Sequence, residues 1–282
     1  MNCAKGKDIS MILTYLFLIV FAALMVYPLL WVVSASFKPN EDIFKSLNLI
    51  PSRIVTDSYI NGWRGTGQYT FGRFFLNTFI LVVPTVVFTV MSSTVVAYGF
   101  ARFEFPLKKI LFALMIATLM LPDSVILIPR YILFNKFHWV DSYKPFIIPA
   151  VFASTPFFVF MMVQFLRGLP KELEESATID GCNSFQILLR ITIPLCVPAI
   201  ISMAIFQFIW TWNDFLNTLI YINSVSKYTV SLGLRMSIDA TSAVNWNQIM
   251  AMTVISMLPC IIIFFSAQKY FVEGIATTGL KG

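Results

Sequence analysis

Ionisable side chains are concentrated in residues 169–198 of this otherwise apolar chain. Within twenty residues lie Lys171, Glu172, Glu174, Glu175, Asp180 and Arg190. Uncharged runs long enough to cross a bilayer flank the segment on both sides, so its charged groups must lie in water. In water these side chains are accessible to another protein, and they could bind it through electrostatic interactions.

The same segment has the local chemistry of a helix, a turn and a second helix. Pro170 suits a first helical position, because its missing N–H would have no partner there. The glutamates then lie in the first turns, where carboxylates favour the positive end of the helix dipole. Gly181 suits a left-handed helix end, and Asn183 or Ser184 can cap a second helix that Pro194 ends or kinks. On helical spacing alone, a loop that merely joins two spans fits as well.

A longer spaced pattern favours docking. Glu175-Ser176-Ala177 is followed after three residues by Gly181, and after nine more by Ile191-Thr192-Ile193-Pro194. This resembles the EAA loop of bacterial ABC-importer membrane subunits: Glu-Ala-Ala, three residues, Gly, nine residues, Ile-x-Leu-Pro. The spacing matches throughout, with mild departures at Ser176 and Ile193. The loop of that family is cytoplasmic, and the resemblance implies that these positions couple to an ATPase: Glu175, Ser176, Ala177, Asp180, Gly181, Ile191 and Pro194.

The resemblance covers nearly the whole chain and narrows the family to carbohydrate-type ABC importer permeases. Residues 170–181, Trp212-Asn213-Asp214 and residues 272–282 look like the smaller membrane subunit of maltose-type systems. In that family the C-terminal tail reaches into the ATPase dimer. Ordinary disorder at a terminus is the other interpretation of these residues. The resemblance implies ATPase contacts for Gly274, Gly279, Lys281 and Gly282.

A sugar path would need an aromatic surface and a few hydrogen-bonding groups in an apolar cavity. Trp210, Trp212, Asn213 and Asp214 supply these types within one predicted span and are candidates for it. Packing or an interfacial position is the commoner role of membrane aromatics. In maltose-type systems the other permease carries most of the sugar contacts, which weakens the assignment.

No catalytic or metal-binding motif accompanies these residues in the sequence. The chain has no Gly-x4-Gly-Lys-Ser/Thr phosphate loop, no His-Glu-x-x-His, no Gly-x-Ser-x-Gly and no Cys-x-x-Cys. Its four cysteines show no paired spacing, so we expect neither a disulfide framework nor a metal site. We expect a transport subunit that binds no cofactor, and the resemblance assigns ATP and Mg²⁺ to a partner ATPase.

The composition is that of an integral membrane protein. Of 282 residues, 58% are hydrophobic and 12% are charged, about half the fraction of charged residues in ordinary soluble domains. The net charge of +6 comes from scattered basic residues. Scattered charges argue against nucleic-acid binding and fit positive loops held against an anionic leaflet.

Six apolar runs predict an all-α protein with six transmembrane helices, and the resemblance implies the transmembrane domain of a type I ABC importer. Pro122 and Asp123 interrupt the third run, and we expect the Asp123 carboxylate at the membrane interface rather than in the bundle interior. The runs are residues 11–37, 77–101, 110–129, 145–166, about 191–222 and 249–267.

The predicted organisation has four parts. They are a cytoplasmic N-terminus (1–10), a first span with an outer loop (11–76), a core permease domain (77–268) that contains the coupling loop (169–194), and a cytoplasmic C-terminal tail (269–282).

Six spans place both termini on the same side as the EAA-like loop. The 20 Lys and Arg residues divide equally between the two sides, so the positive-inside rule does not decide the orientation. The resemblance implies a bacterial inner or plasma membrane with both termini cytoplasmic. It also implies a second homologous permease, two ATPase subunits, an extracellular solute-binding protein, and a sugar or oligosaccharide substrate.

Two other classes of transporter stay open. An ABC permease for a non-sugar solute would share the loop but lack Trp212-Asn213-Asp214 and the glycine-bearing tail. An ion-coupled secondary transporter would show an inverted repeat, broken helices and paired acids. The sequence displays no convincing repeat of that kind.

Overall fold

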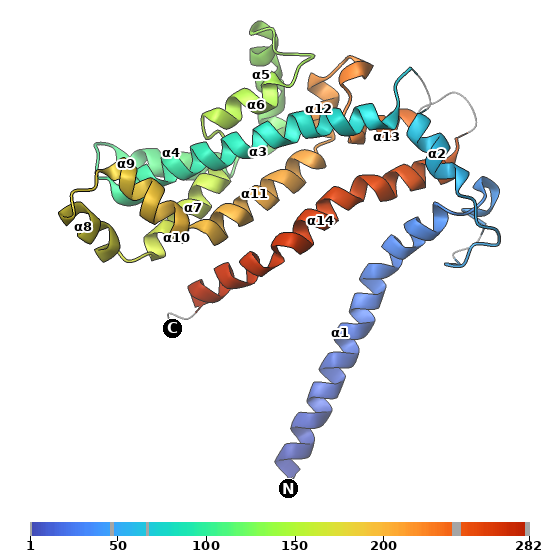
Figure 1. The fold of residues 1–282 in the computed structure, drawn as a ribbon, viewed down its shortest axis with the longest axis horizontal. Coiled ribbons are helices and arrows are strands. Elements are labelled where there is room, and N and C mark those ends of the chain that lie inside the picture. The colour runs from blue at the N-terminus through green and yellow to red at the C-terminus, as the bar shows by residue number, and fades with distance from the viewer. Residues whose placement is uncertain (1, 46–47, 66–67, 239–243, 280–282) are drawn as a thin grey trace. The chain divides into compact units, whose positions relative to one another are not determined.

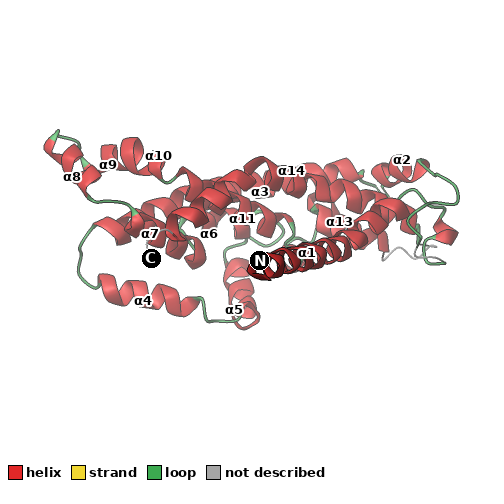
Figure 2. Cartoon of the chain, turned by 90° about the horizontal axis from the view of Figure 1, so that it is seen from below, coloured by secondary structure: helices red, strands yellow, loops and turns green. Residues whose placement is uncertain are grey.

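The computed structural model describes residues 2–45, 48–65, 68–238 and 244–279, with side chains from residue 11 to residue 269. All regular elements in these ranges are helical (Figures 1 and 2). The chain divides into two compact units. Unit 1 comprises Met1–Gly72 and Gly233–Leu258, and unit 2 comprises Arg73–Leu232 and Pro259–Gly282.

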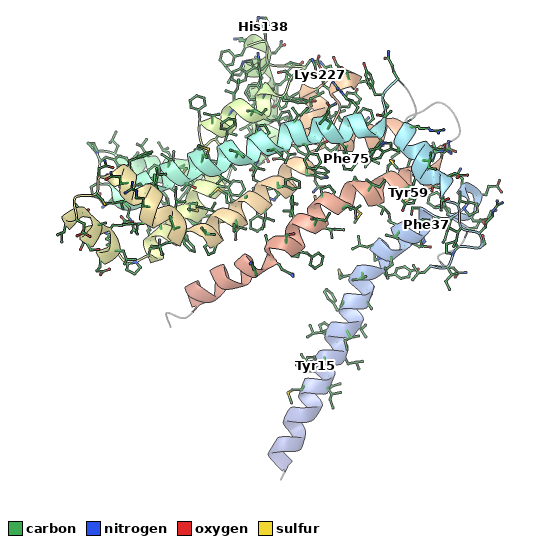
Figure 3. The ribbon with its side chains drawn as sticks, viewed as in Figure 1. Tyr15, Phe37, Tyr59, Phe75, His138 and Lys227 are labelled. Atoms are coloured by element: carbon green, nitrogen blue, oxygen red, sulfur yellow. The ribbon has the colours of Figure 1, made fainter. Side chains whose placement is uncertain are left out.

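Unit 1 holds the first predicted span and the outer loop that follows it. Helix α1 (Asn2–Ala35) leads into the short helices η1 (Asn40–Asp42) and α2 (Asp57–Arg64). The rings of Phe37 and Tyr59 lie 5.2 Å apart, and the Tyr59 hydroxyl lies 2.7 Å from Ser36 Oγ (Figure 3). Phe44 contacts Trp246 edge-on at 5.2 Å, at the start of α14 (Trp246–Gly279). The described residues of the outer loop are therefore packed against one another and against the start of α14.

The apolar stretch of α1 is largely exposed among the described residues. In Met11–Ala35 the most apolar window is 0% buried, and Tyr15 projects freely from the ribbon in Figure 3. A helix that is apolar on all sides needs lipid or other helices around it. This observation fits the first predicted span.

Unit 2 contains most of the helices between Arg73 and Leu232. It begins with α3 (Phe71–Arg102), α4 (Lys108–Thr118), α5 (Asp123–Lys136), α6 (Lys144–Val151) and α7 (Pro156–Gly168). After α8 (Glu172–Ile179), α9 (Ser184–Ile187), η2 (Leu188–Thr192) and α10 (Ile193–Leu195) come α11 (Val197–Trp212), α12 (Leu216–Tyr221) and η3 (Val225–Lys227). Helix α13 (Val230–Ile238) begins in unit 2 and continues in unit 1 from Gly233. The core packs α7 against α3 and α11 through Ala97, Tyr98, Phe158, Met162, Leu166 and Met203.

Six segments correspond to the predicted spans, four of them unbroken. The unbroken ones are Met11–Ala35, Phe71–Arg102, Lys144–Gly168 and Trp246–Lys269. The other two are bent pairs: Lys108–Thr118 meets Asp123–Lys136 at 102°, and Ser184–Leu195 meets Val197–Trp212 at 77°. Counting each bent pair once gives the six spans that the sequence predicts.

The third predicted span, over 110–129, is broken where the sequence places Pro122 and Asp123. The helix stops at Thr118 and restarts at Asp123, because Pro122 takes an extended conformation with ψ 135° and cannot continue the helix. The Asp123 side chain is 94% exposed within the chain and lies 3.5 Å from the Arg130 guanidinium.

The predicted fifth span over about 191–222 is wrong in its extent. Helix α11 ends at Trp212 and α12 begins at Leu216. The Asp214 carboxylate accepts the N–H of Asn217, in the first turn of α12, at 3.1 Å, a bond that favours a new helix start.

A polar network holds the loops of unit 2 near α5 and α12 (Figure 3 labels Lys227 there). Asp141 Oδ1 accepts the N–H groups of Asn223 and Ser224 at 3.0 and 2.8 Å, and Lys227 Nζ donates to Asp141 Oδ2 at 2.8 Å. Burial raises the pKa of the Asp141 carboxyl, but the hydrogen bonds from Lys227 and Ser224 outweigh it and hold that pKa well below its usual range. The ionised carboxylate thus ties together two loops that are 82 to 86 residues apart in the chain.

Candidate coupling site

The EAA-like segment forms a compact helical element at the end of α3. Helix α8 (Glu172–Ile179) is followed by a turn, α9 (Ser184–Ile187), the five-residue π-helix η2 (Leu188–Thr192) and α10 (Ile193–Leu195). Figures 1 and 2 show α8 and α9 at the end of unit 2 where α4 begins. The predicted helix–turn–helix is therefore present.

Local hydrogen bonds explain where α8 begins and ends. The N–H groups of Glu174 and Glu175 bond to the Lys171 carbonyl at 2.9 and 3.0 Å, so the helix starts at Glu172. Pro170 lies before the helix and not at its first position, which corrects the prediction. At the other end Gly181 N–H bonds to Thr178 O, and the next N–H bonds to the carbonyl five residues back. These two bonds form a Schellman motif, and Gly181 takes the left-handed φ of 84° that it requires.

The second helix starts with a reciprocal pair of hydrogen bonds. Asn183 Oδ1 accepts the Gln186 N–H at 2.9 Å, and Gln186 Oε1 accepts the Asn183 N–H at 2.9 Å. This is a capping box, so Asn183 and not Ser184 is the capping residue. The 77° bend into α11 falls at Cys196. Pro194 lies two residues before the bend, inside α10.

Polar and large apolar side chains share the surface of this element. Glu175, Ser176 and Asp180 are exposed, as are Ile179 at 87% and Phe185 at 68%. Exposed apolar groups beside carboxylates are typical of a surface that another protein covers.

The remaining candidate positions of the loop lie closer to the body of the unit. Ala177 is 6% exposed, so its small side chain lets α8 approach the body of unit 2 closely. Ile191 is half-buried and Pro194 is exposed. The predicted coupling residues thus divide into an outward set around Glu175 and a supporting set around Ala177.

A buried ion pair that the sequence analysis missed fixes α8 to the rest of unit 2. Arg102 Nε, at the end of α3, lies 2.8 Å from Glu174 Oε1, and the side chains are 6% and 16% exposed. Removing one partner of a buried pair typically costs about 3–5 kcal/mol. The available sequence signal was an arginine directly after an uncharged span, but nothing in one sequence says which of several glutamates it meets.

The candidate sugar-path tryptophans lie on opposite sides of α11. Trp212 is 3% exposed, and its ring lies 5.8, 5.0 and 5.3 Å from those of Phe75, Phe79 and Phe208. Figure 3 labels Phe75 on α3. Side chains two residues apart on an α-helix point about 200° apart. Trp210 therefore faces the side of α11 opposite to Trp212.

Trp210 and the polar pair that follows α11 are more accessible within the chain than Trp212. Trp210 is 47% exposed and lies 5.3 and 5.1 Å from the rings of Phe157 and Phe158. Asn213 is exposed and donates to the Ile209 carbonyl at 2.8 Å. Asp214 is half-buried. The structure therefore groups Asn213 and Asp214 at the α11–α12 break and separates them from the packing around Trp212.

The candidate tail residues are only partly described. Helix α14 continues to Gly279 and so includes Gly274. The expected tail is thus helical over much of its length. Lys281 and Gly282 lie outside the described residues.

Comparison with known proteins identifies the family. Residues 93–277, well over half of the chain, match the family described as "Binding-protein-dependent transport system inner membrane component". The chain belongs to this family. It is therefore a multi-pass membrane transport subunit, and the matched residues include α8, α9 and the bend into α11.

Relatives of known sequence match along almost the full chain. The probable ABC transporter permease protein YurM of Bacillus subtilis is 35% identical over 95% of this chain and 88% of its own length. The arabinooligosaccharides transport system permease protein AraQ of B. subtilis is 33% identical over 95% and 94%. The sn-glycerol-3-phosphate transport system permease protein UgpE of Yersinia pestis is 29% identical over 96% of both chains.

A solved structure shares the fold of this permease. A chain from the crystal structure of a bacterial ABC transporter involved in the import of the acidic polysaccharide alginate superposes with a TM-score of 0.83 at 21% identity. The match covers 94% of this permease and 98% of that chain. The likeness establishes the type I importer fold.

Proposed function

We propose that this permease is one half of the translocation path of an ATP-driven importer for sugars or oligosaccharides. The observation that carries the proposal is the α8–Gly181–α9 element. It presents Glu175, Ile179 and Phe185 to the outside while Glu174 is held inside the chain. Such an element suits a cleft in a second protein, and membership of the binding-protein-dependent transport family supports a role in transport.

The proposed complex contains four other subunits and a delivered substrate. A second homologous permease completes the path, two ATPase subunits bind ATP and Mg²⁺, and an extracellular solute-binding protein delivers the solute. Both termini and α8 face the cytoplasm of a bacterial cell. The C-terminal residues Gly274, Gly279, Lys281 and Gly282 contact the ATPases, and Trp210, Asn213 and Asp214 contribute to the path. Two relatives support a sugar or oligosaccharide as the solute: the arabinooligosaccharides permease AraQ and the alpha-glucoside permease AglG of Rhizobium meliloti.

Conformational coupling follows from this arrangement. Closure of the ATPase pair on nucleotide would carry α8 with it, and the spans would rock between outward-open and inward-open states. ATP favours one state and the solute-loaded binding protein favours the same one, so each promotes the action of the other.

ATP hydrolysis in liposomes that hold the complete complex tests the proposal. Arabino-oligosaccharides, alpha-glucosides and sn-glycerol 3-phosphate are supplied with the binding protein. We expect one of the sugars to stimulate hydrolysis, and we expect Glu175→Lys and Gly181→Pro to abolish the stimulation. Glu104→Lys is the matched control, because Glu104 is a glutamate 89% exposed in the loop after α3. Stimulation by the glycerol phosphate alone would reassign the solute, and solute uptake without any ATPase would overturn the proposal.

A further inference from the structure

The ion pair between Arg102 and Glu174 belongs to a set of contacts that surrounds α8. The Arg102 guanidinium also donates from Nη2 to the Leu169 carbonyl at 3.4 Å, directly after α7. Thr192 Oγ1, in the π-helix η2, donates to the same Glu174 oxygen at 3.3 Å and is 1% exposed. One guanidinium and one carboxylate therefore join the end of α3 to residues before, within and after the coupling helix.

The preceding turn of α3 holds α9 in the same way. Tyr98 is 6% exposed, and its hydroxyl donates to the Ser184 carbonyl at 3.5 Å, at the first residue of α9. Its side chain lies in a buried cluster with Leu166, Leu188 and Cys196. All these residues belong to unit 2. Helices α8 and α9 cannot swing about their connecting loops without breaking buried polar contacts, which are costly to leave unpaired.

We propose that Arg102 and Glu174 are positioning residues that make α8 and the end of α3 move as one body. The inference rests on the function proposed above and deepens it. A displacement of α8 by the ATPase then reaches a membrane span directly, through the contacts of Arg102 and Glu174, and not only along the connecting residues 169–171 and 181–183. Adjacent glutamates have separate tasks: Glu174 anchors α8 within the chain, and Glu175, which is exposed, meets the partner.

A distance measurement on a complex that keeps Arg102 and Glu174 tests the rigid connection. Spin labels are placed at Val95→Cys and Glu172→Cys, both exposed and both in unit 2, after the native cysteines have been replaced. Pulsed electron paramagnetic resonance measures the distance between the two labels in the nucleotide-free complex and in the complex trapped with ATP. We expect one unchanged distance distribution in both states. A shift of about 5 Å, which is roughly one helical turn, would show that α8 moves relative to α3 and would overturn the proposal.

Variants test whether the rigid connection is needed for coupling. Glu174→Gln and Arg102→Gln are expected to lower the amount of solute imported per ATP by at least about tenfold, a usual size for coupling between sites. Basal hydrolysis should persist, because the ATPases themselves are unaltered. The exchanged pair Arg102→Glu with Glu174→Arg should recover much of the loss. Glu104→Gln is the matched control, since it removes an exposed glutamate that lies 2.9 Å from Lys108.

The outcomes separate this inference from the function on which it rests. If Glu175→Lys abolishes stimulation while Glu174→Gln and Arg102→Gln behave like Glu104→Gln, only the rigid connection is wrong. If Glu175→Lys also leaves stimulation intact, the coupling role of α8 itself fails. If the single variants do not assemble, the exchanged pair and the label distances still decide.

Discussion

Glu174 and Glu175 are consecutive in the chain but their carboxylates meet different surroundings. One turn of an α-helix takes 3.6 residues, so neighbouring side chains point about 100° apart. Glu174 therefore faces Arg102, whereas Glu175 faces outward. The different surroundings of the two glutamates are the main reason for expecting different effects from the same substitution at these positions.

At Gly181 we expect an alanine substitution to cost about 1 kcal/mol, because the left-handed conformation is unfavourable for residues with a Cβ. An added Cβ would meet no atom within 4 Å, so the cost is conformational and not steric. Gly181→Asn should cost less, since asparagine tolerates this conformation. Hydrogen exchange of the α8 and α9 amides measures the effect. The control is Gly168→Ala at the end of α7, where space is also open; equal effects at both sites would contradict the explanation.

At Asp141 we expect a pH-dependent contribution to stability. The folded-state pKa of its carboxyl is depressed, so the contribution is complete above the unfolded-state value of about 4 and is lost as pH falls toward the folded-state value. Asp141→Asn weakens hydrogen bonds to a charged acceptor, which are worth about 1.5–3 kcal/mol each. The thermal unfolding temperature is measured between about pH 6 and pH 3, on either side of the unfolded-state pKa. It should fall less steeply with decreasing pH for Asp141→Asn than for the unaltered protein. Parallel curves for the two proteins would contradict the assignment.

Among the elements, α11 carries two tryptophans in different environments. Trp212→Ala should destabilise the fold by about 3–5 kcal/mol, because it empties a buried site among Phe75, Phe79 and Phe208. Trp210→Ala should cost less, since Trp210 is 47% exposed. Thermal unfolding in detergent and solute uptake are compared for both variants. If Trp210 lies on the path, Trp210→Ala lowers uptake at nearly unchanged stability; similar unfolding temperatures for the two variants would contradict the packing difference.

Signals within a few residues predicted the local elements well. Asn183 and Gly181 each define a helix end through bonds to near neighbours, and the predicted glutamates occupy the first turn of α8. The interruption at Pro122 and the kink near Pro194 were predicted, but the bend angles of 102° and 77° were not, because an apolar run has the same composition whether it is straight or bent. The pairing of Arg102 with Glu174 spans 72 residues, and no local pattern encodes a contact over that distance.

For the whole molecule, the proposed orientation predicts which side of the membrane each loop occupies. Cys182, in the turn between α8 and α9, should react with a membrane-impermeant maleimide in inside-out vesicles. A cysteine at the exposed Ser52 should react in right-side-out vesicles. We expect this labelling pattern because α8 is proposed to face the cytoplasm. Ser52 follows the first span and therefore lies on the opposite side of the membrane from the cytoplasmic N-terminus. Replacement of the other native cysteines makes the labelling specific, and the reverse pattern would invert the topology.

The ion pair at the end of α3 has a consequence for exchanging parts between related transporters. The coupling segment 169–194 contains the acid of the pair but not the base, because Arg102 lies in a different part of the chain. A segment transplanted into another permease would bring a buried carboxylate into a protein that offers it no counter-ion, unless the recipient has an arginine at the same place. The EAA-like loop is therefore not an interchangeable module on its own; the smallest unit that can be grafted includes the last turn of α3.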